Sequence, residues 1–374
     1  MISQEPVACP DCGLVQSLPP IADHEVARCI RCQRLLKVPD ALSNASFALI
    51  LGALLLWLPG CLAPLMTVYA GGASRSATLL DCALKLFGTG YSPLGVLVLT
   101  LMILVPSTFM LLLVIAQVSL LCPRPVAERL RMWAQHLRPW LMTEVFVVGA
   151  CVAYSRIQSE GTVQVDYGGW CLAGSAMLLL ASLAMLGEYT GSPQPHTQAA
   201  LRRASKASQE ATAALVFAGF VLYIPANVMP ILEIESYGSV THNTIVGGAI
   251  ELIHYGLWPL AVIVFMASVV IPLAKLFGLS WLLWQTHRHS PKLLRERTRV
   301  YRLIDTIGRW SNIDVFTLSL LAALVQFGAL ERVRPEPGAV AFAGVVLITM
   351  IAAQCFDPRA MWRAARSPPP SVPT

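Results

Sequence analysis

Hydrophobic residues are grouped into long runs that alternate with polar connections along most of the chain. A helix that spans a bilayer needs about 20 mostly apolar residues, and eight runs approach or exceed that length. They cover residues 46–68, 94–121, 141–154, 170–186, 211–232, 257–284, 310–330 and 338–355. The third run is short and reaches spanning length only with its flanking residues. We therefore predict an all-α integral membrane protein with eight spans, and an even number of spans places both termini on one side.

The two halves of the chain share a sequence pattern at a fixed spacing. The segment PGCLAPL, which starts at Pro59, aligns with PANVMPI, which starts at Pro225, at an offset of 166 residues. Later in each half the offset becomes 170, so that Glu144 aligns with Asp314. This period is far longer than that of a solenoid repeat. We interpret it as a duplicated four-helix module, and four crossings per copy make the two copies parallel.

The pattern divides the chain into five segments. These are a small cysteine-containing domain (1–43), a first transmembrane module (44–188), a linker (189–210), a second module (211–358) and a tail (359–374). In each module a polar outer segment contains a part-amphipathic stretch, 77–87 or 243–254, that is expected to lie along the membrane face. Pro106 and Pro272 occupy one repeat position and predict a kink in the longest helix of each module.

Composition and charge agree with a membrane protein. The chain is 56% hydrophobic and 13% charged, with a mean hydropathy of +0.63, whereas soluble domains are about one-quarter charged. The polar start of the chain is not a cleavable signal. Of the Lys and Arg residues in the connections, 21 fall on the side that holds the termini and 5 on the other, which predicts cytoplasmic termini. Topology thus explains the net charge of +6 without a nucleic-acid partner.

Four cysteines near the N-terminus have the spacing of a metal site. Cys9 and Cys12, then Cys29 and Cys32, form C-x2-C-x16-C-x2-C, which is typical of tetrahedral thiolate coordination. Reduced thiols are expected in the cytoplasm, and a segment this short needs the metal to fold. We favour one structural Zn²⁺. Iron in the same four-sulfur geometry, or a dithiol redox pair, is the alternative.

A charged residue lies deep inside one apolar run. Lys275 sits within residues 257–284, and a lysine at mid-bilayer depth costs roughly 2.5–3.5 kcal/mol on insertion scales. Ser268 shares its helix face, and Ser311 and Asp314 share a face at the start of the next run. Thr349 lies in the middle of the last run. We predict that these five residues form a polar cluster in which Asp314 is the counter-charge of Lys275.

The repeat offers an internal control for this cluster. The positions that correspond to its five residues in the first module are Met102, Phe109, Leu141, Glu144 and Leu179. Four of the five are apolar, so the fold of a module does not require the polar cluster. This favours a functional role for the cluster over that of a structural ion pair. The sequence contains no nucleophile–base motif, phosphate loop or His-rich metal cluster, and we do not expect an enzyme.

The combination of motifs resembles a known family. A CPxCG…CxxC ribbon precedes two modules, and the second carries YIPANVMPI, IPLAKLFGL and GRWSNIDVF. Over nearly its whole length the chain is similar to the paraquat-inducible protein A family of Gram-negative inner membranes. The resemblance implies exchange of phospholipid between the inner membrane and a periplasmic MCE-domain tunnel protein. It also implies that the family's polar cluster corresponds to Ser268, Lys275, Ser311, Asp314 and Thr349, which makes proton coupling plausible.

One departure from the family and two other functions bear on this expectation. Fuller members carry a second cysteine ribbon before the second module, whereas residues 188–210 contain no cysteine, so one metal site is expected here. A membrane-bound redox or stress sensor would use the cysteines with iron in place of zinc. A proton-coupled carrier of small solutes would share the polar cluster but would need a closed polar cavity.

Overall fold

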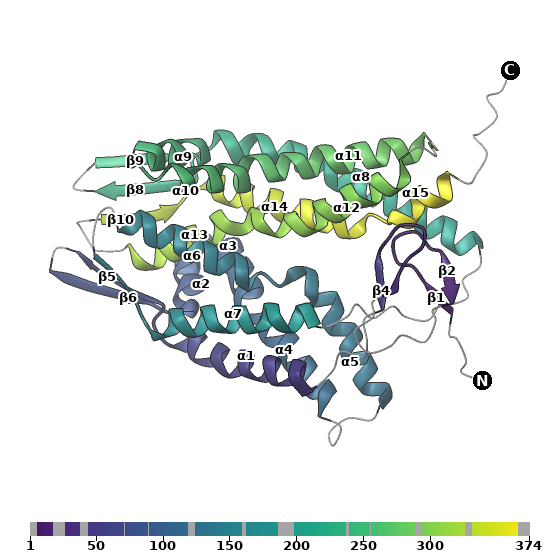
Figure 1. Ribbon diagram of the computed structural model, residues 1–374. Helices are drawn as coiled ribbons and strands as arrows, with labels where there is room; N and C mark the ends of the chain where they lie inside the picture. The colour runs from purple at the N-terminus through teal and green to yellow at the C-terminus, as the bar shows by residue number, and fades with distance from the viewer. Residues whose placement is uncertain are drawn as a thin grey trace.

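The structure is a computed structural model. It describes residues 6–17, 27–37, 44–70, 72–88, 90–118, 124–158, 162–185, 198–236, 239–254, 256–288, 290, 293–325 and 331–365. Long helices run side by side between two ends of the molecule (Figure 1). Small sheets lie at one end, and the cysteine-containing hairpins lie at the other end beside the last helix. The first and last described elements are therefore on the same side.

Among the described residues, seven helices are long and apolar enough to cross a membrane. They are Ala45–Leu62, Ser92–Gln117, Val126–Ile157, Tyr167–Met185, Ala204–Val228, Trp258–His287 and Pro337–Cys355. The protein is thus a mostly helical, multi-pass membrane protein. The predicted run 310–330 is shorter in the structure, where a 3-10 turn, η4 (Gly308–Asn312), precedes α13 (Ile313–Leu324). Together they fall below the roughly 20 residues of a straight span, and residues 326–330 lie outside the described residues, so eight spans stay a prediction.

The outer helices of each half pack in pairs. In the first half α1 (Asn44–Leu62) packs along α7 (Tyr167–Met185), and in the second half α8 (Gln198–Val228) packs along α14 (Pro337–Cys355). Glycines allow this close approach, because a Cβ added at Gly60 would lie 3.1 Å from the backbone nitrogen of Leu172 in α7. Small residues are the usual means by which helices approach each other in a membrane.

The longest helix of each half contains a π-helical turn at one repeat position. In the first half α3 (Ser92–Leu99), η1 (Thr100–Leu104) and α4 (Val105–Gln117) follow one another without a break. In the second half the corresponding elements are α10 (Trp258–Phe265), η3 (Met266–Val270) and α11 (Ile271–His287). Each π turn directly precedes the proline that was expected to disturb the helix. Proline lacks an N–H and its ring crowds the preceding carbonyl, and a widened turn accommodates both effects.

The third helix of each half is preceded by an amphipathic helix. The first half has α5 (Arg124–Leu137), η2 (Arg138–Trp140) and α6 (Thr143–Ile157). The second half has α12 (Leu294–Ile307), then η4 and α13, at an offset of 170 residues. The same order of elements thus occurs twice in the chain.

Short strands at one end of the molecule add to the mostly helical fold that the sequence predicted. The expected polar outer segments form two three-stranded antiparallel sheets, with strand orders β6-β5-β7 and β10-β8-β9. Their strands are β5 (Met66–Ala70), β6 (Ala73–Ala77), β7 (Thr162–Val165), β8 (Leu232–Ser236), β9 (Ser239–Asn243) and β10 (Glu331–Pro335). The two part-amphipathic stretches are the helices α2 (Leu79–Gly88) and α9 (Ile245–His254). Each sheet includes a strand from a connection that is distant in the chain. The sequence pattern alone does not predict that this strand pairs with the others.

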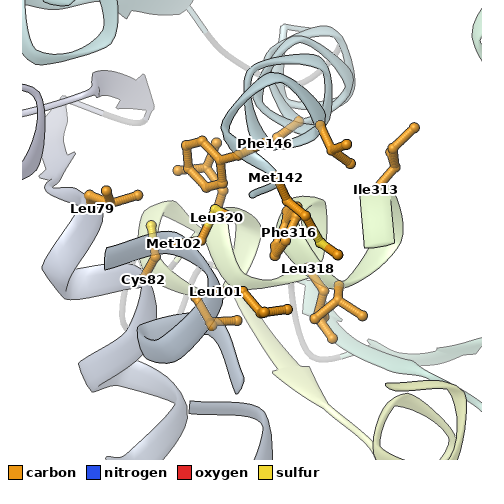
Figure 2. Close-up of a cluster of buried hydrophobic side chains, with 14 of the residues drawn as sticks. Leu79, Cys82, Leu101, Met102, Met142, Phe146, Ile313, Phe316, Leu318 and Leu320 are labelled. Atoms are coloured by element: carbon orange, nitrogen blue, oxygen red, sulfur yellow. The ribbon is translucent and has the colours of Figure 1, made fainter. Parts of the chain in front are cut away.

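The two halves meet along their third helices, α6 and α13. The rings of Phe146 and Phe316, which are repeat-equivalent residues, lie 5.9 Å apart, and the hydroxyl of Thr317 donates to the Gly149 carbonyl at 3.1 Å. Figure 2 shows the surrounding apolar cluster, to which α2, η1, α6 and α13 all contribute side chains. The interior around the first half is therefore filled with hydrocarbon and sulfur.

Candidate functional site

The four predicted metal ligands lie together on two short hairpins. Strands β1 (Pro6–Ala8) and β2 (Val15–Ser17) form one hairpin, and β3 (Ala27–Arg28) and β4 (Leu35–Lys37) form the other. We call these two hairpins the cysteine ribbon. Its turns are alike, since Gly13 and Gln33 both have left-handed backbones, with φ of 67° and 61°. The left-handed residue after each C-x2-C lets one tight turn present two sulfurs on one side.

The geometry of these cysteines suits a metal ion. All four side chains are buried and their sulfurs lie within 4.8 Å of one another, with Cys9 Sγ 3.4 Å from Cys32 Sγ. The residues fit a four-coordinate metal, as the spacing predicted, and protein sulfurs would fill every position of a tetrahedral site.

The cysteine ribbon is attached to the second half by an acidic residue between its ligands. Asp11 has only 3% of its side chain exposed and accepts from Arg34 at 2.6 Å and from Arg302 of α12 at 2.7 Å. Arg302 also donates to the carbonyl and to the sulfur of Cys32, at 3.2 and 3.5 Å. A buried carboxylate is stable only when it is paired, so Asp11 joins the ribbon to α12.

Further contacts extend this interface to α15 (Pro358–Ala364). The guanidinium of Arg359 donates to the Pro10 carbonyl at 2.8 Å, and that of Arg31 lies 5.0 Å from the ring centre of Trp362. The Trp362 indole in turn donates to Thr298 of α12 at 3.2 Å. The ribbon therefore rests on two elements of the second half. Sequence reasoning did not find these arginines, because their partners are distant in the chain.

Lys275 is buried among second-half elements. Only 2% of the residue is exposed, and its ammonium donates to the Gly308 carbonyl at 3.4 Å. The Ser311 hydroxyl donates to the same carbonyl at 2.8 Å. A Cβ added at Gly308 would lie 3.1 Å from the Lys275 nitrogen, so the absence of a side chain there lets the amine approach the backbone. The structure thus brings Lys275 and Ser311 together, as predicted.

Asp314 and Ser268 form a second polar contact. The Ser268 hydroxyl, in η3, donates directly to the Asp314 carboxylate in the first turn of α13. Ser268 is fully buried. The π turn thus presents a hydroxyl to the helix that joins the two halves.

The predicted ion pair between Lys275 and Asp314 is not present among the described residues. Asp305, in the last turn of α12, is the carboxylate whose charge acts on Lys275, whereas Arg156 from the first half acts on Asp314. Ser268 and Lys275 are seven residues apart, which is about 10 Å along a helix. Asp314 lies at the level of Ser268, and that separation leaves the amine beside Gly308.

Thr349 stands apart from these polar contacts. Its hydroxyl donates to the Val346 carbonyl in its own helix at 3.0 Å. Its methyl group faces the gap at Gly219, where an added Cβ would lie 3.7 Å from it. Helices often satisfy a threonine hydroxyl in this way. Of the five predicted residues, Ser268 and Asp314 contact each other, Lys275 and Ser311 share the Gly308 carbonyl as acceptor, and the hydroxyl of Thr349 is bonded within its own helix.

The corresponding residues of the first half are apolar and buried. Met102, Phe109, Leu141 and Leu179 are each at most 3% exposed, and Figure 2 places Met102 inside the apolar cluster. Glu144, which corresponds to Asp314, accepts from Arg309 of the second half at 3.3 Å. At these four positions, polar side chains are thus found in the second half alone.

Two residues near the cluster were not singled out from the sequence. Asn312 is fully buried, and its amide donates to the sulfurs of Met142 and Met350 at 3.0 and 3.5 Å. Its oxygen has no hydrogen-bond partner within the described part of the chain. Asp305 lines a small pocket that also contains Lys275, Gly308 and Arg309. Asn312 lies inside the motif GRWSNIDVF, and its place in that motif could have identified it. Asp305 precedes the motif in an amphipathic helix, where an exposed acidic residue is common.

Comparison with known proteins agrees with this architecture. The chain is 29% identical over 398 residues to intermembrane transport protein PqiA of Escherichia coli, covering 95% of each chain. It is 25% identical to a probable intermembrane transport protein of Haemophilus influenzae, again over 95% of each chain. It is 26% identical to lipophilic envelope-spanning tunnel protein A of Escherichia coli, covering 96% of this chain and 91% of the relative. No solved structure matches the chain.

The family model supports the same assignment. The model for paraquat-inducible protein A matches residues 44–188 and 209–366. The two matched ranges correspond to the two halves in which the order of elements repeats. The resemblance inferred from the motifs is therefore confirmed, and the chain belongs to the paraquat-inducible protein A family.

Proposed function

We propose that this protein is a lipid transporter of a bacterial inner membrane that exchanges phospholipid with a periplasmic MCE-domain tunnel protein. The names of its relatives, an intermembrane transport protein and a lipophilic envelope-spanning tunnel protein, support transport between membranes. The observation that carries the proposal is the buried polar cluster in the second half, with apolar residues at four of the five corresponding positions in the first half. Because the protein has this interior and no recognised catalytic motif, we assign it a transport role rather than an enzymatic one.

The proposed arrangement in the membrane follows from charge and topology. Eight spans form two parallel four-helix modules, and the basic connections place both termini and the cysteine ribbon in the cytoplasm. The contacts of the ribbon with α12 and α15 agree with termini on one side. The two sheets then lie in the periplasm, where they are available to a tunnel protein. The ribbon holds one structural zinc, because four protein sulfurs leave no open position.

Lys275 is the central residue of the proposed transport site. Ionisable residues inside a membrane usually mark a pathway for substrate or ions. The amine of Lys275 can lose and regain a proton during transport. The backbone carbonyl of Gly308 holds the ammonium in place between these events. Ser268 and Asp314 form the next polar step toward the sheets.

Replacement of Lys275 tests this function. In a strain that lacks the gene, Lys275→Ala is expected to leave the outer-membrane barrier as weak as in the deletion strain. Growth in the presence of a detergent that the intact barrier excludes measures this, with expression checked by immunoblot. Lys85→Ala in α2, the amphipathic helix beside the sheets, is the matched control and is expected to restore growth. Full growth with Lys275→Ala would contradict the proposal.

A further inference from the structure

The pocket beside Lys275 lies between the two halves on the side that holds the cysteine ribbon. Pro139 of the first half lines it together with Asp305, Arg309 and Gln354 of the second. Lys275 is buried at its inner end, whereas Asp305 and Gln354 are exposed at the surface. The space is about the size of one water molecule. It is too narrow for a lipid headgroup, but it is wide enough to connect the amine to solvent.

The charged groups around the pocket have distinct partners. Arg309 pairs with Glu144 of the first half, and Asp314 accepts from Ser268. Asp305 is the carboxylate that acts on Lys275. Asp305 is also the acidic side chain in the described lining of the pocket that contains Lys275, so it faces the amine across this space.

A neighbouring tyrosine is not a competing proton acceptor. Tyr301 lies one turn before Asp305 and donates its hydroxyl to the Ala353 carbonyl at 3.1 Å. Burial raises the pKa of Tyr301, so this residue is neutral at physiological pH and has no charge to exchange with Lys275. Asp305 is thus the titratable side chain of α12 placed to exchange a proton with the amine.

Buried residues flank Lys275 on its other side. Toward the sheets, the helix that carries Lys275 presents the buried residues Ala261, Val264 and Ala267. The contact between Ser268 and Asp314 spans the gap between this helix and α13. The pocket therefore gives Lys275 a short aqueous connection to the ribbon side, and this connection ends at a carboxylate.

We propose that Asp305 is the proton relay between Lys275 and the aqueous phase on the ribbon side of the protein. One proton leaves the Lys275 ammonium, passes through a water molecule in the pocket and protonates the Asp305 carboxylate, which gives a neutral amine and a carboxylic acid. Asp305 then releases the proton to bulk water, and the reverse steps recharge the amine. This inference rests on the proposed transport function and assigns it a proton route on one side of the membrane.

Variants of Asp305 test the relay. The full-length protein is reconstituted with its tunnel partner in vesicles of phosphatidylethanolamine and phosphatidylglycerol, and movement of a fluorescent phosphatidylethanolamine is followed between pH 5.5 and 8.5. Asp305→Asn is expected to lower the rate at least about a hundredfold, the lower end of the range for loss of a proton-transfer group, and to change the shape of the pH profile. Asp305→Glu keeps a carboxylate and is expected to restore both. Glu296→Gln, exposed on the same helix, is the control and retains the wild-type profile.

A second variant tests the pocket without changing a titratable group. Ala353→Leu places a larger side chain in the lining of the pocket and is expected to give the same defect as Asp305→Asn. Thermal unfolding in detergent verifies that each variant is folded. Wild-type rates and pH profiles for both variants would overturn the relay, even where Lys275→Ala abolishes transport. Wild-type transport with Lys275→Ala would instead overturn the proposed function itself.

Discussion

The two halves of this protein have the same order of elements but different interiors. At the position of Lys275 the first half has Phe109, and at the position of Ser268 it has Met102. Both first-half residues are buried, and the π turn and the following proline occur in both halves. The fold therefore forms with or without polar groups in the centre. The comparison supports the proposal that the polar cluster of the second half has a chemical role, since packing is satisfied without it.

The strongest test of this comparison places the lysine in the first half. Phe109→Lys is expected to destabilise the protein by about 3–5 kcal/mol, because an unpaired charge would be buried without a carboxylate near it. Phe109→Met, which keeps the site apolar, is expected to cost less than about 1.5 kcal/mol. Thermal unfolding of both variants in detergent measures the difference. Equal stability of the two would mean that the first half also accommodates charge, and the comparison would fail.

A smaller effect is expected from the glycine that admits the amine in the second half. The residue that corresponds to Gly308 in the first half is Arg138, so the repeat does not require a glycine there. Gly308→Ala would put a Cβ 3.0 Å from Lys275 Cε. The end of a lysine can shift, so the loss of stability is expected to stay near about 1 kcal/mol. The displaced amine would no longer reach the carbonyl, and transport is expected to fall severalfold.

A glycine with open surroundings provides the control for this substitution. A Cβ added at Gly88 of α2 would meet no atom within 4 Å, so Gly88→Ala is expected to leave stability within about 0.5 kcal/mol and transport unchanged. The detergent-growth assay and thermal unfolding compare the two variants. If Gly308→Ala transports as well as Gly88→Ala, then the contact between Lys275 and the backbone has no role in transport.

The sequence predicted the metal ligands and the composition of the polar cluster but not its pairing. Cysteine spacing constrains the ligand geometry directly, because each pair is presented by one local turn. The need of a buried lysine for a counter-charge is a weaker guide, and it suggested Asp314 as the partner of Lys275. The residue that acts on the amine is Asp305, which lies in an amphipathic helix outside the apolar runs. Local patterns could not show that this helix returns to the level of Lys275.

The strands were missed for a related reason. The segments that form β5 and β8 are short and follow a helix with a proline inside it. Their pairing partners β7 and β10 come from connections much later in the chain. A short strand has little stability without such partners, and the sequence pattern of one segment does not identify them. The repeat gave the positions of the outer segments but not their conformation.

The last prediction lies outside the transport site and concerns the attachment of the cysteine ribbon to the second half. Arg302 joins Asp11 and Cys32 to α12, whereas the corresponding residue of the first half is Met132. Arg302→Ala leaves Asp11 paired with Arg34, so the ribbon is expected to stay folded and to bind one zinc per chain. Loss of one charged contact, worth about 1.5–3 kcal/mol, is expected to loosen the ribbon from α12.

Release of zinc to a chromogenic chelator measures this loosening, because a ribbon held against α12 exposes its sulfurs less often. Arg302→Ala is expected to speed release several-fold, whereas Arg299→Ala, on an exposed side chain paired with Glu296, is expected to release zinc at the wild-type rate. Equal rates for the two variants would mean that the ribbon does not depend on this contact. Iron in place of zinc in the purified protein, with its visible absorption, would favour a redox role. The ribbon, which contacts the second half, would then be a redox centre as well as a structural difference between the two halves.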